Sequence, residues 1–260
     1  MTKRLHFIWY QGFYSIPSEI KYVPEMWEEY NEGYEIHLWD QWSLLALIKQ
    51  KYPEYMLFYL GLGSDEPENI RIIKRCDFAR LLLLHAFGGW YIDMDCVPLR
   101  PLSSLLDSRQ VDHALTEFAY SSSKFWRTDL SALPASPKTI DFESYQMIFT
   151  REHAPSTEVG GRTVCNGFLY AKAGSSILAD LIDGCLPHGD KKVLKFAGPH
   201  GLSTQLRGMI DKIRGAVLVL PPFYFLWQSH DMGPPWSKTV CCHINRMDWA
   251  DKSLTKPWDI

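Results

Sequence analysis

Two aspartates, Asp93 and Asp95, stand one residue apart in the stretch GGWYIDMDCVPL, residues 88–99. Residues i and i+2 of a β-strand point to the same face, so we expect the two carboxylates to lie together at the end of a buried strand. Such like charges repel each other unless a cation lies between them. Hard divalent cations prefer carboxylate oxygens. The motif therefore predicts a metal site that can also hold a diphosphate, the alternative being two unrelated acids in a solvated loop.

The segment before this motif adds charged residues at a helical spacing. Lys74, Asp77 and Arg80 recur every three residues within NIRIIKRCDFARLLLLHAFGG, so they share one face of a helix expected from about residue 70 to residue 87. Gly88 and Gly89 supply the helix stop. We expect this face to lie beside the two aspartates, although a ladder of surface ion pairs would produce the same spacing.

Predicted strands and helices alternate along the chain, which indicates an α/β fold with a mostly parallel sheet. We expect a single domain over residues 1–260, with an excursion at about 119–162 that is rich in Ser, Thr and Pro. The tail from Gln228 shows little periodicity, which suggests a lid at about 228–260 or a fixed strap. Strands are expected at residues 5–10, 34–40, 90–95, 112–120, 163–174 and 216–227, and further helices at 41–52, 175–186 and toward 213.

Composition excludes several classes of protein. Charged residues make up 22% and aromatic residues 14% of the 260 residues, which is typical of a globular chain. The net charge of −3 and the lack of a Lys/Arg run argue against nucleic-acid binding. The six cysteines form no CxxC pair, which favours a reducing compartment. With no transmembrane segment and no signal peptide in the sequence, we expect a cytoplasmic protein.

The combined pattern K-x2-D-x2-R followed by GG-x-Y-x-D-x-D resembles the DXD-type glycosyltransferases of the sugar-binding-region family. That family includes fungal outer-chain mannosyltransferases, capsular polysaccharide transferases and, more distantly, the clostridial glucosylating toxins. Weaker similarity extends to HFIWYQG, NGFLYAKAG, GPHGLST and HINRMDW, whereas residues 119–162 have no recognised counterpart.

The resemblance implies a GT-A fold, with a Rossmann-like central sheet flanked by helices. It also implies a retaining, metal-dependent hexosyltransferase that uses Mn²⁺ or Mg²⁺. The donor would be a nucleotide-sugar, with UDP favoured and GDP as the alternative, and the acceptor a glycan or another hydroxyl. A bacterial or viral enzyme of polysaccharide biosynthesis fits best; a Golgi enzyme would require that an anchor had been trimmed.

The resemblance also assigns roles to particular residues. Trp9 would stack on the base, which would pair with the backbone near Phe7 and Ile8. The donor site would include Lys74 and Tyr91, and the sugar hydroxyls would be held by Asp77 and Arg80, with Asn166 nearby. The ribose and the metal would be bound by Asp93, the metal directly by Asp95, and the diphosphate covered by His243, on the metal, and Trp249.

Other interpretations stay open. The stretch WYIDMDCV also resembles the nucleophile motif of haloacid-dehalogenase-type phosphatases, in which Asp93 would attack phosphorus. A sugar-binding module without turnover would carry the same residues. Trp9 on a first strand also fits an ordinary core position, and Asn166 a loop cap. A zinc site at His243 is discounted because Cys241 and Cys242 are adjacent, unlike the usual spacing of zinc ligands.

Overall fold

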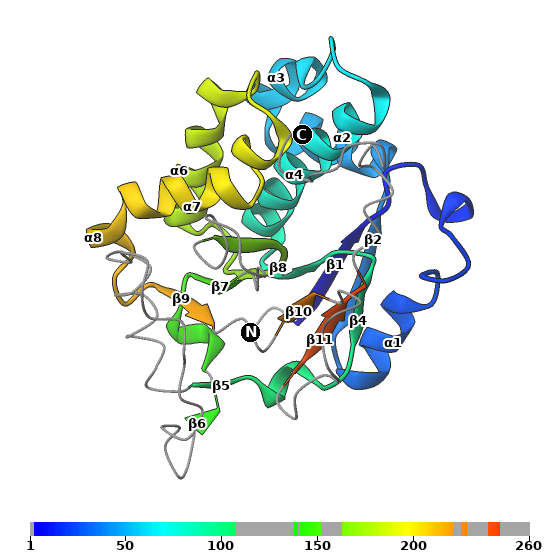
Figure 1. The fold of residues 1–260 in the computed structure, drawn as a ribbon, viewed down its shortest axis with the longest axis vertical. Coiled ribbons are helices and arrows are strands. Elements are labelled where there is room, and N and C mark those ends of the chain that lie inside the picture. The colour runs from blue at the N-terminus through cyan, green and yellow to red at the C-terminus, as the bar shows by residue number, and fades with distance from the viewer. Residues whose placement is uncertain are drawn as a thin grey trace.

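The computed structural model of the chain describes residues 3–107, 138–139, 141–151, 163–220, 225–227 and 239–244. Its main sheet has six strands in the order β2-β1-β3-β8-β7-β9 (Figure 1). Strands β1, β2 and β3 run parallel, β7 runs parallel to β9, and β8 runs antiparallel to both of its neighbours. The predicted α/β class with a mostly parallel sheet is therefore confirmed. The strands of this sheet are β1 (Arg4–Ile8), β2 (Glu35–Trp39), β3 (Gly89–Ile92), β7 (Met147–Arg151), β8 (Val164–Ala171) and β9 (Val217–Leu220).

Most helices cover one face of the main sheet, and their apolar side chains form one hydrophobic core with it (Figure 1). These helices are α2 (Gln41–Lys51), α3 (Met56–Gly61), α4 (Glu68–Phe87), α6 (Ser176–Cys185), α7 (Pro199–Gly208) and α8 (Ile210–Ile213). None of the helices in the described residues combines the length and hydrophobicity that a membrane span requires.

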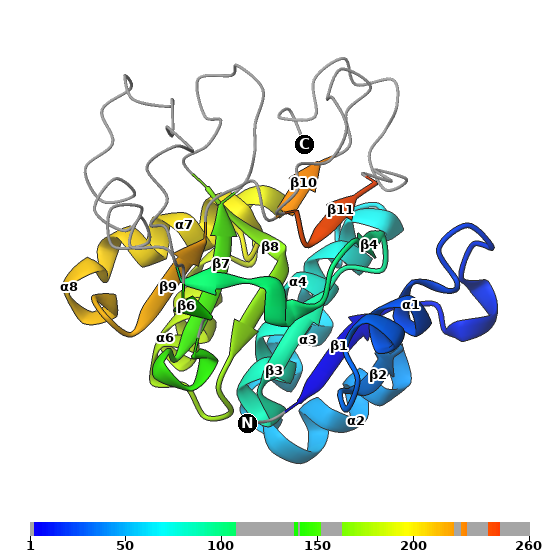
Figure 2. The same cartoon turned by 90° about the horizontal axis from the view of Figure 1, so that it is seen from below.

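The opposite face of the sheet packs against a second core, to which α1 (Val23–Tyr30) and a three-stranded sheet contribute. This sheet has the order β10-β11-β4 and is built from β4 (Cys96–Pro98), β10 (Phe225–Trp227) and β11 (Cys241–His243) (Figure 2). A two-stranded pair joins β5 (Leu106–Asp107) to β6 (Lys138–Thr139). Because apolar layers cover both faces of the main sheet, its central strands are buried throughout, as in β8.

The glycine pair between α4 and β3 lets a helix turn directly into a central strand. Gly88 has φ 65° and Gly89 has φ 102°, which are left-handed conformations that favour glycine. A Cβ on Gly89 would lie 2.5 Å from the carbonyl oxygen of Arg4 on β1. The expected helix stop is therefore confirmed, and the second glycine is also required by the close approach of β1 and β3.

The structure corrects three boundaries. Residues 147–151, expected within the excursion, form the buried strand β7, which lies between β8 and β9 in the main sheet. The single strand expected at residues 216–227 is divided between β9 and β10, which belong to different sheets. The tail shows little periodicity and no strand was assigned to it, yet residues 241–243 form β11. In each case the missing signal is long-range pairing, which local periodicity does not encode. The strand expected at 112–120 lies outside the described residues.

A buried histidine, His6 on β1, links β1 to the glycine pair and to β2. Its Nε2 lies 3.0 Å from the carbonyl oxygen of Gly88, and the indole N–H of Trp39 donates to its Nδ1 over 3.2 Å. This arrangement fits the neutral ring with the proton on Nε2. Burial lowers the pKa of His6 from 6.5 to about 4.

This lowered pKa predicts a pH-dependent loss of stability. Below pH 6.5 the unfolded chain is protonated at His6, whereas the folded chain stays neutral there until about pH 4. The stability contributed by the neutral ring is therefore present above pH 6.5 and is lost as the pH falls toward 4. The full effect is about 3 kcal/mol. Urea unfolding between pH 7 and pH 4.5 measures it: a His6→Gln variant loses less stability over this range than the wild type. The exposed His188→Gln variant serves as control, and parallel curves for His6→Gln and wild type would contradict the assignment.

Candidate metal and donor site

The two aspartates of the DXD motif lie on a turn and not on one strand face. Strand β3 ends at Ile92, and residues 93–95 form the connection to β4. The backbone N–H of Asp93 donates to the carbonyl of Gly167 on β8 over 2.8 Å, and the carbonyl of Asp95 accepts from Ile244 over 3.0 Å. The two carboxylates therefore do not share a strand face, contrary to the prediction from the sequence. Hydrogen bonds to Gly167 on β8 and to Ile244 after β11 hold the turn in place.

Arg80 on α4 joins the helix to this turn. Its guanidinium lies 2.7 Å from Asp77 Oδ1 and 3.3 Å from Asp93 Oδ1, and it donates to the carbonyl of Asn166 over 2.7 Å. It also lies over the ring of Tyr91, with its Cζ 4.5 Å from the ring centroid. The Tyr91 hydroxyl donates to the same Asp93 Oδ1 over 2.7 Å. The expected approach of Asp77 and Arg80 to the DXD motif is thus confirmed for Asp93.

Burial and charge set the protonation of this cluster. Burial raises the pKa of Asp77 to about 6, against the opposing effect of Arg80 and of the Asn166 amide, which donates to Asp77 Oδ1 over 3.0 Å. Although burial opposes its charge, Arg80 has its pKa raised overall by Asp93, Tyr91 and Asp77, so it stays a cation. Burial raises the pKa of Tyr91, so its hydroxyl stays neutral and donates.

An irregularity in β8 brings Asn166 and Gly167 to the cluster. Phe149 pairs with Leu169 but Arg151 pairs with Val164, so β8 carries extra residues at this point, as in a β-bulge. A Cβ on Gly167 would lie 2.3 Å from Asp93 Oδ2, so only glycine leaves room for that carboxylate. Gly167 was not predicted as a site residue, although a glycine inside an apolar strand indicates the close approach of another group.

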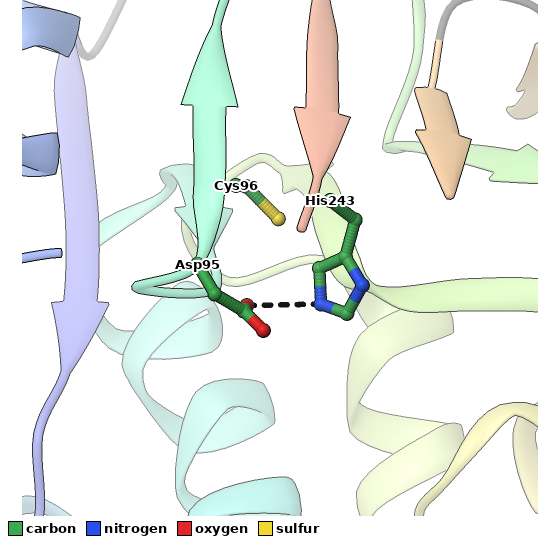
Figure 3. Close-up of side chains that lie close together, drawn as sticks. All are labelled: Asp95, Cys96 and His243. Carbon is green, nitrogen blue, oxygen red and sulfur yellow. Dashed lines mark ion pairs between the residues drawn. The ribbon is translucent and has the colours of Figure 1, made fainter. Parts of the chain in front are cut away.

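His243 on β11 completes a group of metal-ligating atoms. Antiparallel pairing of β11 with β4 sets His243 opposite Cys96. Its Nε2 lies 2.9 Å from Asp95 Oδ1 and 3.9 Å from Asp93 Oδ2. Ligand atoms of Asp95, Cys96 and His243 all lie within 4.8 Å of one another (Figure 3). The structure thus brings together the three predicted metal ligands, Asp93, Asp95 and His243. Cys96 was missed, although it directly follows the motif.

The residues predicted to bind the base lie where β1 ends. Because β1 and β3 are parallel, this end faces the same edge of the sheet as Asp93. Trp9 is half-buried, and its indole N–H donates to the Ser15 hydroxyl over 2.9 Å. Phe7 and Ile8 are buried, and the β1–β3 ladder covers only Leu5 and His6, so the side of their backbone that faces β3 lies outside that ladder.

Lys74 is not brought to this cluster, despite its helical spacing. Its side chain is 1% exposed, and its amine pairs with Glu66 over 2.8 Å and donates to the carbonyl of Gly189 over 3.2 Å. These contacts fasten the segment before α4 to the loop after α6. We therefore do not retain Lys74 as a donor ligand. Trp249, the remaining predicted site residue, lies outside the described residues.

Comparison with known proteins agrees with this geometry. Residues 17–112 match the family model described as "Glycosyltransferase sugar-binding region containing DXD motif". The chain is also 34% identical over 104 residues to an uncharacterized glycosyltransferase of Acanthamoeba polyphaga mimivirus. That alignment covers 39% of this chain and 38% of the viral protein, so it spans well under half of that relative.

Two solved structures are similar in fold. The PaToxG glycosyltransferase gives a TM-score of 0.50 at 17% identity, covering 80% of this chain and 70% of that one. The UDP-bound glycosyltransferase domain of the YGT toxin gives 0.53 at 10% identity, covering 84% and 79%. The expected GT-A fold is thereby confirmed. Residues 17–112, which contain α4 and the Asp93–Asp95 turn, are thus similar to the DXD-containing sugar-binding region of glycosyltransferases.

Proposed function

We propose that the protein is a metal-dependent, retaining glycosyltransferase that moves a hexose from a nucleotide-sugar to a hydroxyl of a glycan or another acceptor. The observation that carries this proposal is the meeting of Asp93, Asp95 and His243 beside the buried Arg80–Asp77 pair. The family match over residues 17–112 supports the same activity.

The candidate metal ligands, Asp93, Asp95 and His243, fit Mn²⁺ or Mg²⁺. Two carboxylates and one imidazole nitrogen face one another, and oxygen-rich sets of this kind suit hard divalent cations, with Mn²⁺ the more tolerant of nitrogen. The Asp93 and Asp95 side chains are 26% and 15% exposed, so a ligand from solvent can reach them. When bound, the cation would supply Lewis-acid stabilisation of the departing diphosphate.

The buried residues have different parts in this proposal. Asp77, held by Arg80 and Asn166, presents a carboxylate at neutral pH that accepts from sugar hydroxyls. Arg80 is engaged by Asp77, Asp93 and the Asn166 carbonyl, so we assign it to positioning those groups and not to direct contact with the sugar. A cluster fixed in this way orients the sugar before reaction, which lowers the barrier.

Trp9 is the proposed platform for the base, because it is half-buried at the carboxyl end of β1 and fixed through Ser15. The backbone of Phe7 and Ile8 on the β3 side would pair with the base edge. We favour UDP over GDP, since a flat indole suits either ring and no described residue here is placed to read a guanine edge; one fold neighbour is itself described as UDP-bound.

The competing readings differ in what they explain. A phosphatase that uses Asp93 as nucleophile does not account for Tyr91 and Arg80, which both bind Asp93 Oδ1 and would restrain an attacking carboxylate. A sugar-binding module would keep the same contacts without turnover. Release of nucleoside diphosphate from a panel of UDP-, GDP- and dTDP-sugars with Mn²⁺ separates these alternatives.

The first prediction from this proposal concerns the metal. An Asp95→Ala substitution removes the carboxylate nearest His243 and lowers Mn²⁺-dependent release of nucleoside diphosphate by about 100-fold or more, since several kcal/mol of charge stabilisation are lost. The exposed Asp65→Ala variant is the matched control and keeps wild-type activity. Undiminished turnover by metal-stripped protein in excess EDTA would refute metal dependence.

A second prediction concerns the base. Replacing Trp9 by alanine weakens UDP binding, measured by calorimetry with Mn²⁺ present, by roughly 1–3 kcal/mol, the usual worth of aromatic–base stacking. Trp42→Ala removes a tryptophan that is 69% exposed on α2 and leaves UDP affinity unchanged. If folded Trp9→Ala protein binds UDP normally, Trp9 is a core residue only.

A third prediction concerns stereochemistry. An α-linked donor gives an α-linked product if the enzyme retains configuration, as its family resemblance implies. Proton NMR of the glycoside product distinguishes the anomers of a gluco- or galacto-configured sugar through their H1–H2 coupling. A β-linked first product would exclude retention while leaving glycosyl transfer itself intact.

A further inference from the structure

One side chain beside the proposed metal site has no part in the proposed reaction. Cys96 is the first residue of β4, directly after Asp95, and is fully buried. Its Sγ points toward β11 and His243 (Figure 3) and lies within 4.8 Å of the ligand atoms of Asp95 and His243. The pairing of His243 with Cys96 in the β4–β11 ladder fixes this approach, so it follows from the backbone and not from one rotamer.

A thiol next to this site changes which cations it accepts. Carboxylate oxygens bind hard cations such as Mg²⁺ and Mn²⁺, whereas sulfur selects softer ions, of which Zn²⁺ takes Cys, His and Asp together. Ligand atoms in a tetrahedral zinc site lie roughly 3.2–3.8 Å apart, as follows from the usual bond lengths. Here the Asp95 and His243 atoms lie 2.9 Å apart, and all ligand atoms of the three residues lie within 4.8 Å of one another. Small side-chain movements would bring them to the tetrahedral spacing.

We propose that Asp95, Cys96 and His243 form a site for thiophilic divalent ions, with Zn²⁺ as the representative, that occupies two ligands of the catalytic cation and so inhibits sugar transfer. The inhibitory role rests on the proposed function; the binding site itself does not. On binding, the Cys96 S–H bond breaks, its proton passes to solvent and a sulfur–metal bond forms, with no change of oxidation state. The fourth position is left to water.

The two kinds of cation exclude each other because they share Asp95 and His243. A hard cation uses these with Asp93 and leaves the Cys96 thiol protonated, donating toward the Gly167 carbonyl over 3.7 Å. A zinc ion is drawn instead toward β4 and away from the Asp93 side, where the donor diphosphate would bind. Zinc inhibition is therefore expected to be competitive with Mn²⁺.

Cobalt provides a readout that does not depend on activity. Metal-stripped protein, kept reduced with a phosphine, is titrated with Co²⁺ in the absence of nucleotide, and a thiolate-to-cobalt charge-transfer band is expected in the near ultraviolet. Cys96→Ser and Cys96→Ala lose this band. Cys242→Ser is the matched control, because Cys242 lies on β11 and is more exposed, yet is not among the grouped ligand atoms, and it keeps the band.

Further measurements test whether Cys96 is the sulfur ligand. X-ray absorption of wild-type protein loaded with one Zn²⁺ is expected to show one sulfur at about 2.3 Å, which needs no variant to fold. The nearest competing thiol is Cys241, whose side chain contacts Cys96, and Cys241→Ser is expected to keep the cobalt band. In folded Cys96 variants, the Zn²⁺ concentration that half-inhibits Mn²⁺-driven turnover is expected to rise on the order of 10- to 100-fold. This is the effect of losing a hydrogen-bond partner of a metal ligand, and losing a ligand itself costs at least as much.

The outcomes separate this site from the proposed function. Absence of the charge-transfer band and of zinc-bound sulfur in wild type overturns the site, whether or not the protein transfers sugar. A band that persists in Cys96→Ser but disappears in Cys241→Ser overturns the choice of cysteine. A sulfur-containing site in a protein without transferase activity leaves the site standing and removes the proposed function. Zinc inhibition that is unchanged in Cys96→Ala overturns the assignment of that inhibition to the site with Cys96.

Discussion

A guanidinium removed from water must be matched by carboxylates and carbonyls, and this requirement at Arg80 governs how the rest of the structure is arranged. An unpaired buried charge costs several kcal/mol, so α4, the turn after β3 and the irregular part of β8 must all bring an acceptor to the same point. Asp93 is held in one position because Arg80 and Tyr91 both bind its Oδ1. The other oxygen of Asp93 is left facing Gly167 and His243.

Helix α4 carries two buried cations, Lys74 and Arg80, of which only Arg80 lies at the candidate site. Lys74 and Arg80 share a helical spacing, and both are buried. Lys74 is matched by Glu66 before α4 and by the Gly189 carbonyl after α6, whereas Arg80 is matched at the DXD turn. Spacing alone does not distinguish the two, because either cation could face either partner. The difference comes from the partners that each cation meets, of which the Gly189 and Asn166 carbonyls lie far from α4 in sequence.

Local patterns were sufficient to predict the parts of the site that lie within one stretch of chain. The helix with Asp77 and Arg80, its stop at Gly88 and the following strand all follow from periodicity and glycine placement. What could not be predicted depends on distant pairing: the place of β7 between β8 and β9, the turn that carries Asp93 and Asp95, and the space that Gly167 leaves for Asp93. His243 was identified by resemblance, whereas its pairing with Cys96 required the register of β11 on β4.

The antiparallel pairing of β11 with β4 also has a consequence for biosynthesis. Asp93, Asp95 and Arg80 are all translated before β7, β8 and β9, but the imidazole of His243 leaves the ribosome only after the whole main sheet has done so. A nascent chain can therefore build its sheet and bury Arg80 while the cluster still lacks its nitrogen ligand. The complete set of metal-binding atoms is the last part of this architecture to be assembled, so a cation held by carboxylate and imidazole together marks a chain whose synthesis has passed β11.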